Sequence, residues 1–234
     1  MNSVFQYPSD LTLTSIGSKE KPFYSFVKRA FDIIVSLVAL IILFIPFLII
    51  ALIIFIDDPK GSPFYVSERV GKRGKTFKMF KFRSMVIGAE DMLDSLMKDN
   101  DKDGPAFKMH DDPRVTKIGH FLRETSIDEL PQLLNVFLGS MSLVGPRPPI
   151  MKEVVQYSRE DLKRLLVKPG LTCIWQTRKK RDDVPFKEWV TMDVEYIQKR
   201  SVLMDLKLIF KTFSVMLTKQ GTYKSAAKAV LGLI

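Results

Sequence analysis

The chain has 234 residues, of which 46% are apolar, and it carries 36 Lys and Arg against 26 Asp and Glu, a formal charge of +10. This composition excludes general disorder, and the excess positive charge favours anionic partners: nucleic acid, anionic lipid or a phosphorylated substrate. Cys173 is the sole cysteine, so an intramolecular disulfide and a multi-cysteine zinc site are both excluded.

Residues 1–21 are polar, with scattered serine and threonine, and we expect them to form a flexible arm. They do not have the pattern of a signal peptide. The apolar segment starts too late, and no cleavage site of small residues follows it.

Residues 31–56 are almost entirely apolar and form the candidate membrane segment. Pro46 interrupts it and leaves arms of about 22 and 15 Å, each shorter than the roughly 30 Å hydrocarbon core. Basic residues flank both ends, whereas the positive-inside rule places them on one side of a span. Both features favour a re-entrant helix hairpin over residues 22–58, broken at Pro46. A kinked single span is the alternative.

Alternating side chains predict a small β-hairpin, with strands over residues 64–70 and 75–83 and a turn over 71–74. Lys81 and Arg83 would share one face of the second strand. Gly74-Lys75-Thr76 is similar to the end of a P-loop. The required first glycine is Arg69, however, and a strand follows instead of a helix, so this kind of nucleotide site is excluded.

Helical periodicity is present over residues 90–100, 151–167 and 203–217. The last of these segments is amphipathic, and it would lie either in the membrane interface or against the core. The basic run Arg178–Arg181 is either a solvated loop or a contact for phosphate or a lipid headgroup. The fold class expected is mixed α+β and helix-dominated: a membrane hairpin, a small β-hairpin, and amphipathic interfacial helices around the active site.

The most informative stretch is Leu122–Gln132, which contains the adjacent carboxylates Asp128 and Glu129. We expect them to open a helix that ends at Gly139, with Ser126 and Glu129 forming a capping box. Alternatively, Asp128 is the N-cap, which would place Pro131 in the first turn. The positive end of the helix dipole would then favour the ionised carboxylates. Acidic residues in a first helical turn mostly serve only as caps, and that alternative stays open on position alone.

The surrounding charges point to phosphoryl transfer. Arg123 precedes the carboxylates, and Arg147 is held between Pro146 and Pro148, whose fixed backbone angles stiffen the loop. A stiffened guanidinium suits bidentate phosphate binding. Carboxylates, a metal ion and arginines are the groups that enzymes use together to catalyse phosphoryl transfer. A non-enzymatic, membrane-anchored module that binds anionic lipid or nucleic acid is the alternative function.

The chain resembles the bacterial sugar transferases, specifically the short, monotopic polyprenyl-phosphate phosphoglycosyl transferases. The resemblance covers about Lys21 to Leu217 and rests on motifs that occur in order along the chain: Lys28-Arg29-x-Phe31-Asp32, Arg69-Val70-Gly71, Lys81-Phe82-Arg83-Ser84-Met85, Asp112-Pro113-Arg114-Val115-Thr116, Ser126-x-Asp128-Glu129-Leu130-Pro131-Gln132, Val144-Gly145-Pro146-Arg147-Pro148, Lys168-Pro169-Gly170-Leu171-Thr172, Asp193-x-x-Tyr196 and Asp205-Leu206-Lys207.

The resemblance implies transfer of a sugar-1-phosphate from a UDP-sugar to undecaprenyl phosphate, with release of UMP, early in a bacterial glycan pathway. Asp128 would be the nucleophile that forms an aspartyl-phosphosugar intermediate, and Glu129, with Asp128, would hold Mg²⁺. Lys81, Arg123 and Arg147 would bind phosphates. The resemblance further implies a catalytic domain over 59–220 at the cytoplasmic face of the inner membrane. Membrane lipids would then be partners and nucleic acid would not, while homo-oligomerisation is undecided.

The chain departs from the family pattern at three places. Ile45 precedes Pro46 where the family often has serine, Cys173 replaces a frequent glycine, and Arg178–Arg181 replaces a Gly-Arg pair. Gln176, Lys180 and Arg181 are the candidates for contact with the nucleotide-sugar, although the divergence prevents a definite role for the last two. The identity of the sugar is undecided for the same reason, and residues 221–234 are expected to be a frayed tail.

Overall fold

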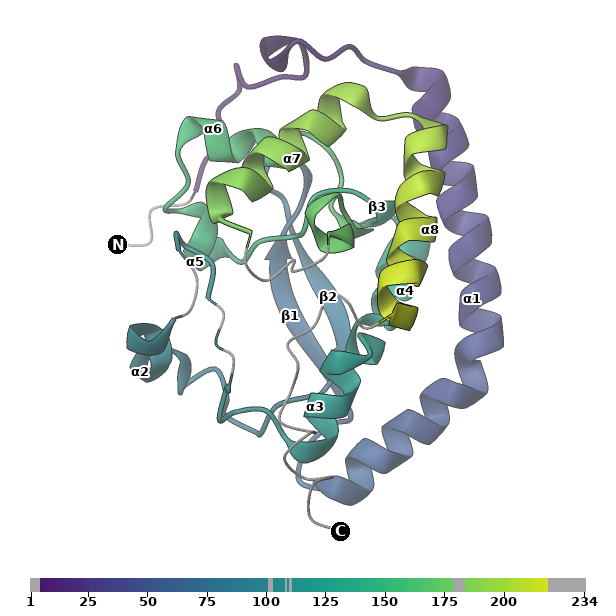
Figure 1. Ribbon diagram of the computed structural model, residues 1–234, viewed down its shortest axis with the longest axis vertical. Helices are drawn as coiled ribbons and strands as arrows, with labels where there is room; N and C mark the ends of the chain where they lie inside the picture. The colour runs from purple at the N-terminus through teal and green to yellow at the C-terminus, as the bar shows by residue number, and fades with distance from the viewer. Residues whose placement is uncertain (1–4, 101–102, 108, 110, 179–183, 219–234) are drawn as a thin grey trace.

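The computed structural model of the chain describes residues 5–100, 103–107, 109, 111–178 and 184–218. A long helix, α1, runs along one side of a mixed body of short helices and two small sheets (Figure 1). The helices are α1 (Pro22–Asp57), α2 (Leu93–Leu96), α3 (Lys117–Glu124), α4 (Gln132–Leu138), α5 (Met151–Val154), α6 (Arg159–Leu162), α7 (Phe186–Lys199) and α8 (Val202–Thr218), and the strands are β1 (Phe64–Val70), β2 (Thr76–Phe82), β3 (Ser142–Val144) and β4 (Gly170–Thr172).

The predicted β-hairpin is confirmed. Strands β1 and β2 pair antiparallel, with Ser67 opposite Met79 and Arg69 opposite Phe77. The 3-10 turn η2 (Lys72–Gly74) joins them. Strands β3 and β4 form a second, parallel pair in which Ser142 is opposite Gly170. This pair brings the proline-rich loop after β3 against the segment before β4.

The described part of α1 passes through Pro46 as one continuous helix, so the interruption expected there is not present. The helix bends at its lower end toward the base of the hairpin (Figure 1). Residues on both sides of Pro46 pack on the body: Leu40 and Leu43 contact the main core, while Phe47 and Ile54 pack beside Phe82 and Leu122. The outer face remains apolar and exposed, and the helix is long and apolar enough to cross a membrane.

Residues 5–21 of the N-terminal arm pack on the body, whereas the polar composition of the arm favours a flexible segment. Leu11, Leu13 and Ile16 are buried in the main core, at 3 to 7% exposed. Ser18 and Lys21 bond to backbone carbonyls at the end of α7 and just after it. The apolar side chains that anchor the arm in the core are spaced without helical or strand periodicity. The overall polar composition of the arm therefore gives no sign of this packing.

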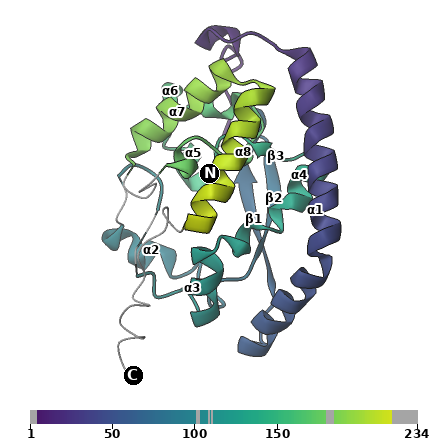
Figure 2. The ribbon, with the colours of Figure 1, turned by 45° about the vertical axis from the view of Figure 1, so that its right-hand side comes forward.

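The helix expected over residues 151–167 is broken into α5, α6 and the 3-10 turn η5 (Lys163–Leu166). Ser158 explains the break, because it forms a capping box with Asp161 and starts α6 afresh. The helix expected over 90–100 is reduced to α2 and the following 3-10 turn η3 (Met97–Asp99). The amphipathic helix expected over 203–217 is confirmed as α8, which lies beside α1 in both views (Figures 1 and 2).

Candidate active site

The paired carboxylates lie at the junction between α3 and α4. Asp128 and Glu129 occupy the 3-10 turn η4 (Ile127–Glu129), and α4 begins only at Gln132. The expected capping box is absent at this turn, since Ser126 makes no side-chain capping bond and has a left-handed backbone (φ 57°). Gly139 ends α4 in the left-handed conformation, as expected.

Helix α4 is fixed from two sides, which positions the turn before it. The amide of Asn135 bonds to the open edge of β2: its Oδ1 accepts from the N–H of Phe80 at 2.9 Å, and its Nδ2 donates to the carbonyl of Lys78 at 2.7 Å. The guanidinium of Arg29 on α1 donates to the carbonyls of Val136 and Phe137 at 2.7 Å each. A cation at a helix C-terminus satisfies carbonyls that lack intrahelical partners.

Lys81 on β2 links the hairpin to the carboxylates. Its Nζ lies 2.9 Å from Oε1 of Glu129 and 3.8 Å from Oδ2 of Asp128. Arg83 does not join it, because β2 ends at Phe82 and the Arg83 guanidinium pairs instead with Asp58 at 2.6 Å. Lys81 therefore belongs to the site and Arg83 does not.

Asp128 is buried, at 6% exposed, and this determines its chemistry. Burial raises the pKa of its carboxyl to about 6; Lys81 and Arg123 oppose the rise, and Glu129 adds to it. The helix dipole expected to favour the ionised form does not keep this pKa low, because desolvation outweighs the favourable charges around the carboxyl. The carboxyl is still mainly ionised at neutral pH, yet it is a stronger base than an exposed aspartate.

Arg123 on α3 is held by the hydroxyl of Ser84, which accepts from its Nε at 2.9 Å. Its positive charge stabilises the ionised form of Asp128. Beside it lies a buried ion pair, in which Arg114 and Asp112 are 2.7 Å apart. Burial lowers the pKa of the Arg123 guanidinium, which indicates a desolvated cation next to the carboxylate.

Arg147 stands on a loop that short contacts hold rigidly. The N–H of Gly145 donates to the carbonyl of Thr172 at 2.9 Å, and the N–H of Gly170 donates to the carbonyl of Pro146 at 2.9 Å. A Cβ atom added at Gly170 would lie 2.0 Å from the nitrogen of Gly145, so only glycine permits this approach. The loop is also joined to the end of β1, where the N–H of Val70 donates to the carbonyl of Pro149.

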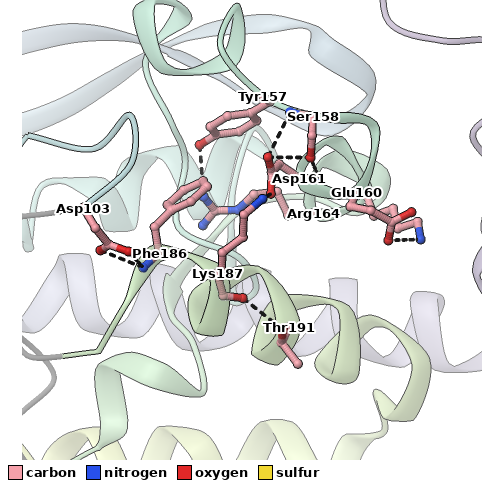
Figure 3. A network of polar contacts seen from close by, with 10 residues as sticks. Asp103, Tyr157, Ser158, Glu160, Asp161, Arg164, Phe186, Lys187 and Thr191 are labelled. Carbon is pink, nitrogen blue, oxygen red and sulfur yellow. Dashed lines mark hydrogen bonds and ion pairs between the residues drawn. The ribbon is translucent and has the colours of Figure 1, made fainter.

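A network of polar contacts, part of which Figure 3 shows around Arg164 and Phe186, joins η5 and α7 next to this loop. Arg164 pairs with Asp193 at 2.7 Å and donates to the hydroxyl of Tyr157 at 3.0 Å. Its Nη2 also reaches the carbonyl of Arg147, at 3.5 Å. Asp103 accepts from the N–H of Phe186 at the first turn of α7. These bonds fix α7 and η5 against the loop and limit its movement.

Four of the expected site residues, Lys81, Glu129, Arg147 and Gln176, line one small cavity that is partly open to solvent. Asp128 is not among the lining side chains, but it neighbours the cavity through Lys81 and Glu129. Pro46 lies in α1, and Lys180 and Arg181 fall outside the described residues. The cavity also contains residues that were not expected: Arg69, Met79, Gln132, Pro148, Gly170 and Leu171.

The hairpin supplies one wall of this cavity. Arg69, Met79 and Lys81 lie on the same face of the β1–β2 pair, because side chains alternate along a strand and the register places their rows together. The alternation could have identified Arg69 from the sequence, since Ser67 and Arg69 form a polar row on that face. Its basic neighbours in the turn concealed this signal.

Asp128 and Glu129 are the candidate ligands for Mg²⁺. The described residues contain no group of three or more metal-ligating side chains, so Asp128 and Glu129 are the available carboxylates. Magnesium is commonly held by one or two carboxylates together with water and substrate phosphates. The residues present therefore fit Mg²⁺ that arrives with a phosphorylated substrate, and Lys81 would then share Glu129 with it.

Comparison with known proteins identifies the family of this chain. The sequence model of the family described as bacterial sugar transferase matches residues 23–219. The chain is 42% identical over 205 residues to a UDP-galactose-lipid carrier transferase of Erwinia amylovora, covering 85% of this chain and 42% of that protein. It is 40% identical over 205 residues to an undecaprenyl-phosphate galactose phosphotransferase of Salmonella typhimurium, with 85% and 42% covered.

An exopolysaccharide production protein, ExoY of Sinorhizobium fredii, is 39% identical over 207 residues, which cover 87% of this chain and 91% of that protein. The chain thus spans nearly the whole of one relative and less than half of the two longer ones. Residues 23–219, which the family model matches, contain the carboxylate pair, the hairpin and the Arg147 loop.

Proposed function

The chain belongs to the bacterial sugar transferase family, and from that premise we propose that it transfers a sugar-1-phosphate from a UDP-sugar to undecaprenyl phosphate, with release of UMP. The observation that carries the proposal is a buried carboxylate, Asp128, set beside a cavity with Lys81 and Arg147 in its wall. Relatives named for transfer onto a lipid carrier or onto undecaprenyl phosphate support the substrate class.

In the first step an ionised oxygen of Asp128 attacks the phosphorus that carries the sugar. The new bond is aspartyl oxygen to phosphorus, and the bond that breaks joins this phosphorus to the bridging oxygen, which leaves on UMP with the electron pair. Lys81 lies 3.8 Å from the Asp128 carboxylate and can neutralise charge on the transferred phosphoryl group. The elevated pKa of Asp128 makes the carboxylate a better nucleophile than an exposed one.

In the second step a phosphate oxygen of the lipid attacks the same phosphorus and restores the Asp128 carboxylate. The acceptor is already an anion, so no base has to remove a proton. This agrees with the residues around Asp128, which are cations and one carboxylate. When bound, Mg²⁺ supplies positive charge to the phosphate oxygens at Glu129. The two half-reactions imply ping-pong kinetics.

We further propose that α1 is a re-entrant anchor with both ends on the cytoplasmic side of the inner membrane. Both of its ends are joined to one folded body: Lys21 bonds to the carbonyl of Arg200 at 2.9 Å, and Asp58 pairs with Arg83 at 2.6 Å. If the two ends of α1 lay on opposite faces of a bilayer, the folded body that contacts both ends would have to extend to both sides of the membrane. The apolar outer face of α1 is left for lipid.

The activity is tested by incubating the purified protein in detergent with undecaprenyl phosphate, Mg²⁺ and a panel of UDP-sugars, and by measuring UMP. At least one UDP-sugar is expected to give UMP and a lipid-linked sugar diphosphate. Release should stop in Asp128→Asn while the fold is retained. Full turnover by this variant would disprove the role of Asp128 as nucleophile.

The topology is tested in a Cys173→Ser background with single cysteines at the exposed positions Glu20 and Lys60. Burial raises the pKa of the Cys173 thiol, so its replacement removes little reactivity. Membrane-impermeant maleimide should label both new cysteines only in inverted vesicles. Labelling of the two positions from opposite sides would refute the re-entrant anchor.

A further inference from the structure

Arg69, near the end of β1, is a cation of the site cavity for which neither sequence nor comparison supplies a role. It lines the cavity together with Arg147, Lys81 and Gln176. Its Nε donates to the hydroxyl of Ser67 at 3.1 Å, and its Nη1 donates to the carbonyl of Pro148 at 3.4 Å. These two contacts orient the guanidinium and leave further N–H groups for another acceptor.

Within the described residues, several other buried or half-buried arginines have closer polar partners than Arg69. Arg164 and Arg114 each pair with a carboxylate at 2.7 Å, and Arg29 bonds to two carbonyls at 2.7 Å. For Arg69 and Arg147, no carboxylate among those residues lies within ion-pair distance. Burial, followed by the charge of Arg147, lowers the pKa of Arg69 to about 10, although the charges of Glu153 and Glu129 oppose this.

Two adjacent guanidinium groups that lack a carboxylate match an anion with two or more negative charges. A diphosphate has this character, and each guanidinium can bind phosphate oxygens through two parallel N–H bonds. The cavity is also next to the carboxylate pair, so a diphosphate held here would have one phosphorus close to Asp128. The loop contacts that fix Arg147 and the two bonds that orient Arg69 would keep this geometry before the substrate arrives.

We propose that Arg69 is a further substrate-binding residue, which forms with Arg147 a two-guanidinium site for the diphosphate of the nucleotide-sugar. This inference rests on the proposed function for the identity of its ligand. Its physical basis is two guanidinium groups in the wall of one cavity, neither of which forms a salt bridge with a carboxylate of the described residues. Arg69 has a second effect, because its bond to the carbonyl of Pro148 also steadies the loop that carries Arg147.

The test measures binding of UDP and of UMP, in the presence of Mg²⁺, by titration calorimetry on the full chain in detergent. Arg69→Gln should weaken UDP binding by about 10- to 100-fold, the range for hydrogen bonds to a charged group, and should weaken UMP binding less. Arg69→Lys, which keeps the charge and loses the forked geometry, should fall between. Arg73→Gln makes the same charge change at an exposed position of the same hairpin and should have no effect.

The double variant of Arg69 and Arg147 to glutamine adds a coupling test. If both side chains bind one diphosphate, the combined loss should be smaller than the product of the single losses, because either change alone disrupts a shared interaction. If Arg69→Gln lowers the unfolding temperature, Arg69→Lys provides the decisive comparison. If both variants fold and both bind UDP as tightly as the native chain, the inference is overturned.

Binding and turnover separate this inference from the proposed function. If UDP binding depends on Arg69 but no UDP-sugar yields UMP, the diphosphate site stands and the transferase proposal fails. If the native chain transfers sugar phosphate, Arg69→Gln should slow UMP release in a single turnover without lipid. A defect that arises only after undecaprenyl phosphate is added would assign Arg69 to the acceptor and overturn the inference.

Discussion

Replacing Asp128 with asparagine should abolish transfer and at the same time stabilise the fold. Burial holds the carboxyl in a site where its charged form is disfavoured and raises its pKa from 3.8 to about 6. Above pH 6 the native chain therefore has to keep an anion in a place that favours a neutral group. Asparagine has nearly the same shape and no charge to desolvate.

The size of the effect follows from proton linkage. A rise from 3.8 to about 6 corresponds to about 3 kcal/mol of unfolding free energy, at 1.36 kcal/mol for each pKa unit. Because the folded-state pKa is the higher one, protonation stabilises the fold. The penalty is complete above pH 6 and disappears as the pH falls below 3.8. For a chain of this size the advantage of Asp128→Asn above pH 6 amounts to an unfolding temperature roughly 6–12 °C higher.

The assay is thermal unfolding in detergent at pH 4, 5, 6, 7 and 8, with Glu129→Gln as the matched control. Glu129 is more exposed and pairs with Lys81 at 2.9 Å, so its loss should leave stability unchanged or lower it. The advantage of Asp128→Asn should grow from near zero at pH 4 to its full value above pH 6. An unfolding temperature equal to or below that of the native chain at pH 8 would refute the reasoning and leave Asp128 as a structural cap.

Three other changes test the same structure. The kcat/KM for UMP release should fall about tenfold for each pH unit below 6, because only the ionised Asp128 attacks, and should be level between pH 7 and 8. Leu11→Ala should lower the free energy of unfolding by about 2–5 kcal/mol, measured by urea denaturation, whereas Thr14→Ala at an exposed position should not. Gly170→Ala should cost about 2 kcal/mol or more and weaken UDP binding, since its Cβ would meet the nitrogen of Gly145 at 2.0 Å.

The features that sequence predicted correctly are those fixed by local pattern. Strand alternation located the hairpin, and amphipathic periodicity placed α8 to within a residue of its ends. The carboxylate pair and the two prolines around Arg147 were recognisable because their significance lies in adjacent residues. Ser158 and Asp161 also carried a readable capping signal, which the apolar periodicity around them obscured.

The features that sequence did not predict depend on contacts between distant segments. Strands β3 and β4 have three residues each, and they exist because two glycines allow their segments to touch. The raised pKa of Asp128 depends on how much protein surrounds it, which no spacing of residues expresses. Arg69 lies 78 positions before Arg147 in the sequence, and only the fold brings the two into one cavity.

Helix α1 connects the exposed apolar side of the molecule with both halves of the site. Arg29 and Asp32 lie one turn apart on its inner face. Arg29 binds the end of α4, the helix that follows the carboxylate pair, and Asp32 accepts from the N–H of Leu143 in β3 at 3.0 Å, the strand that leads to Arg147. If the outer face of α1 lies in the bilayer, its depth sets the height of Asp128 and of the Arg147 loop together. A lipid phosphate at the membrane surface and a soluble nucleotide-sugar could then meet at Asp128 without movement of either half of the site.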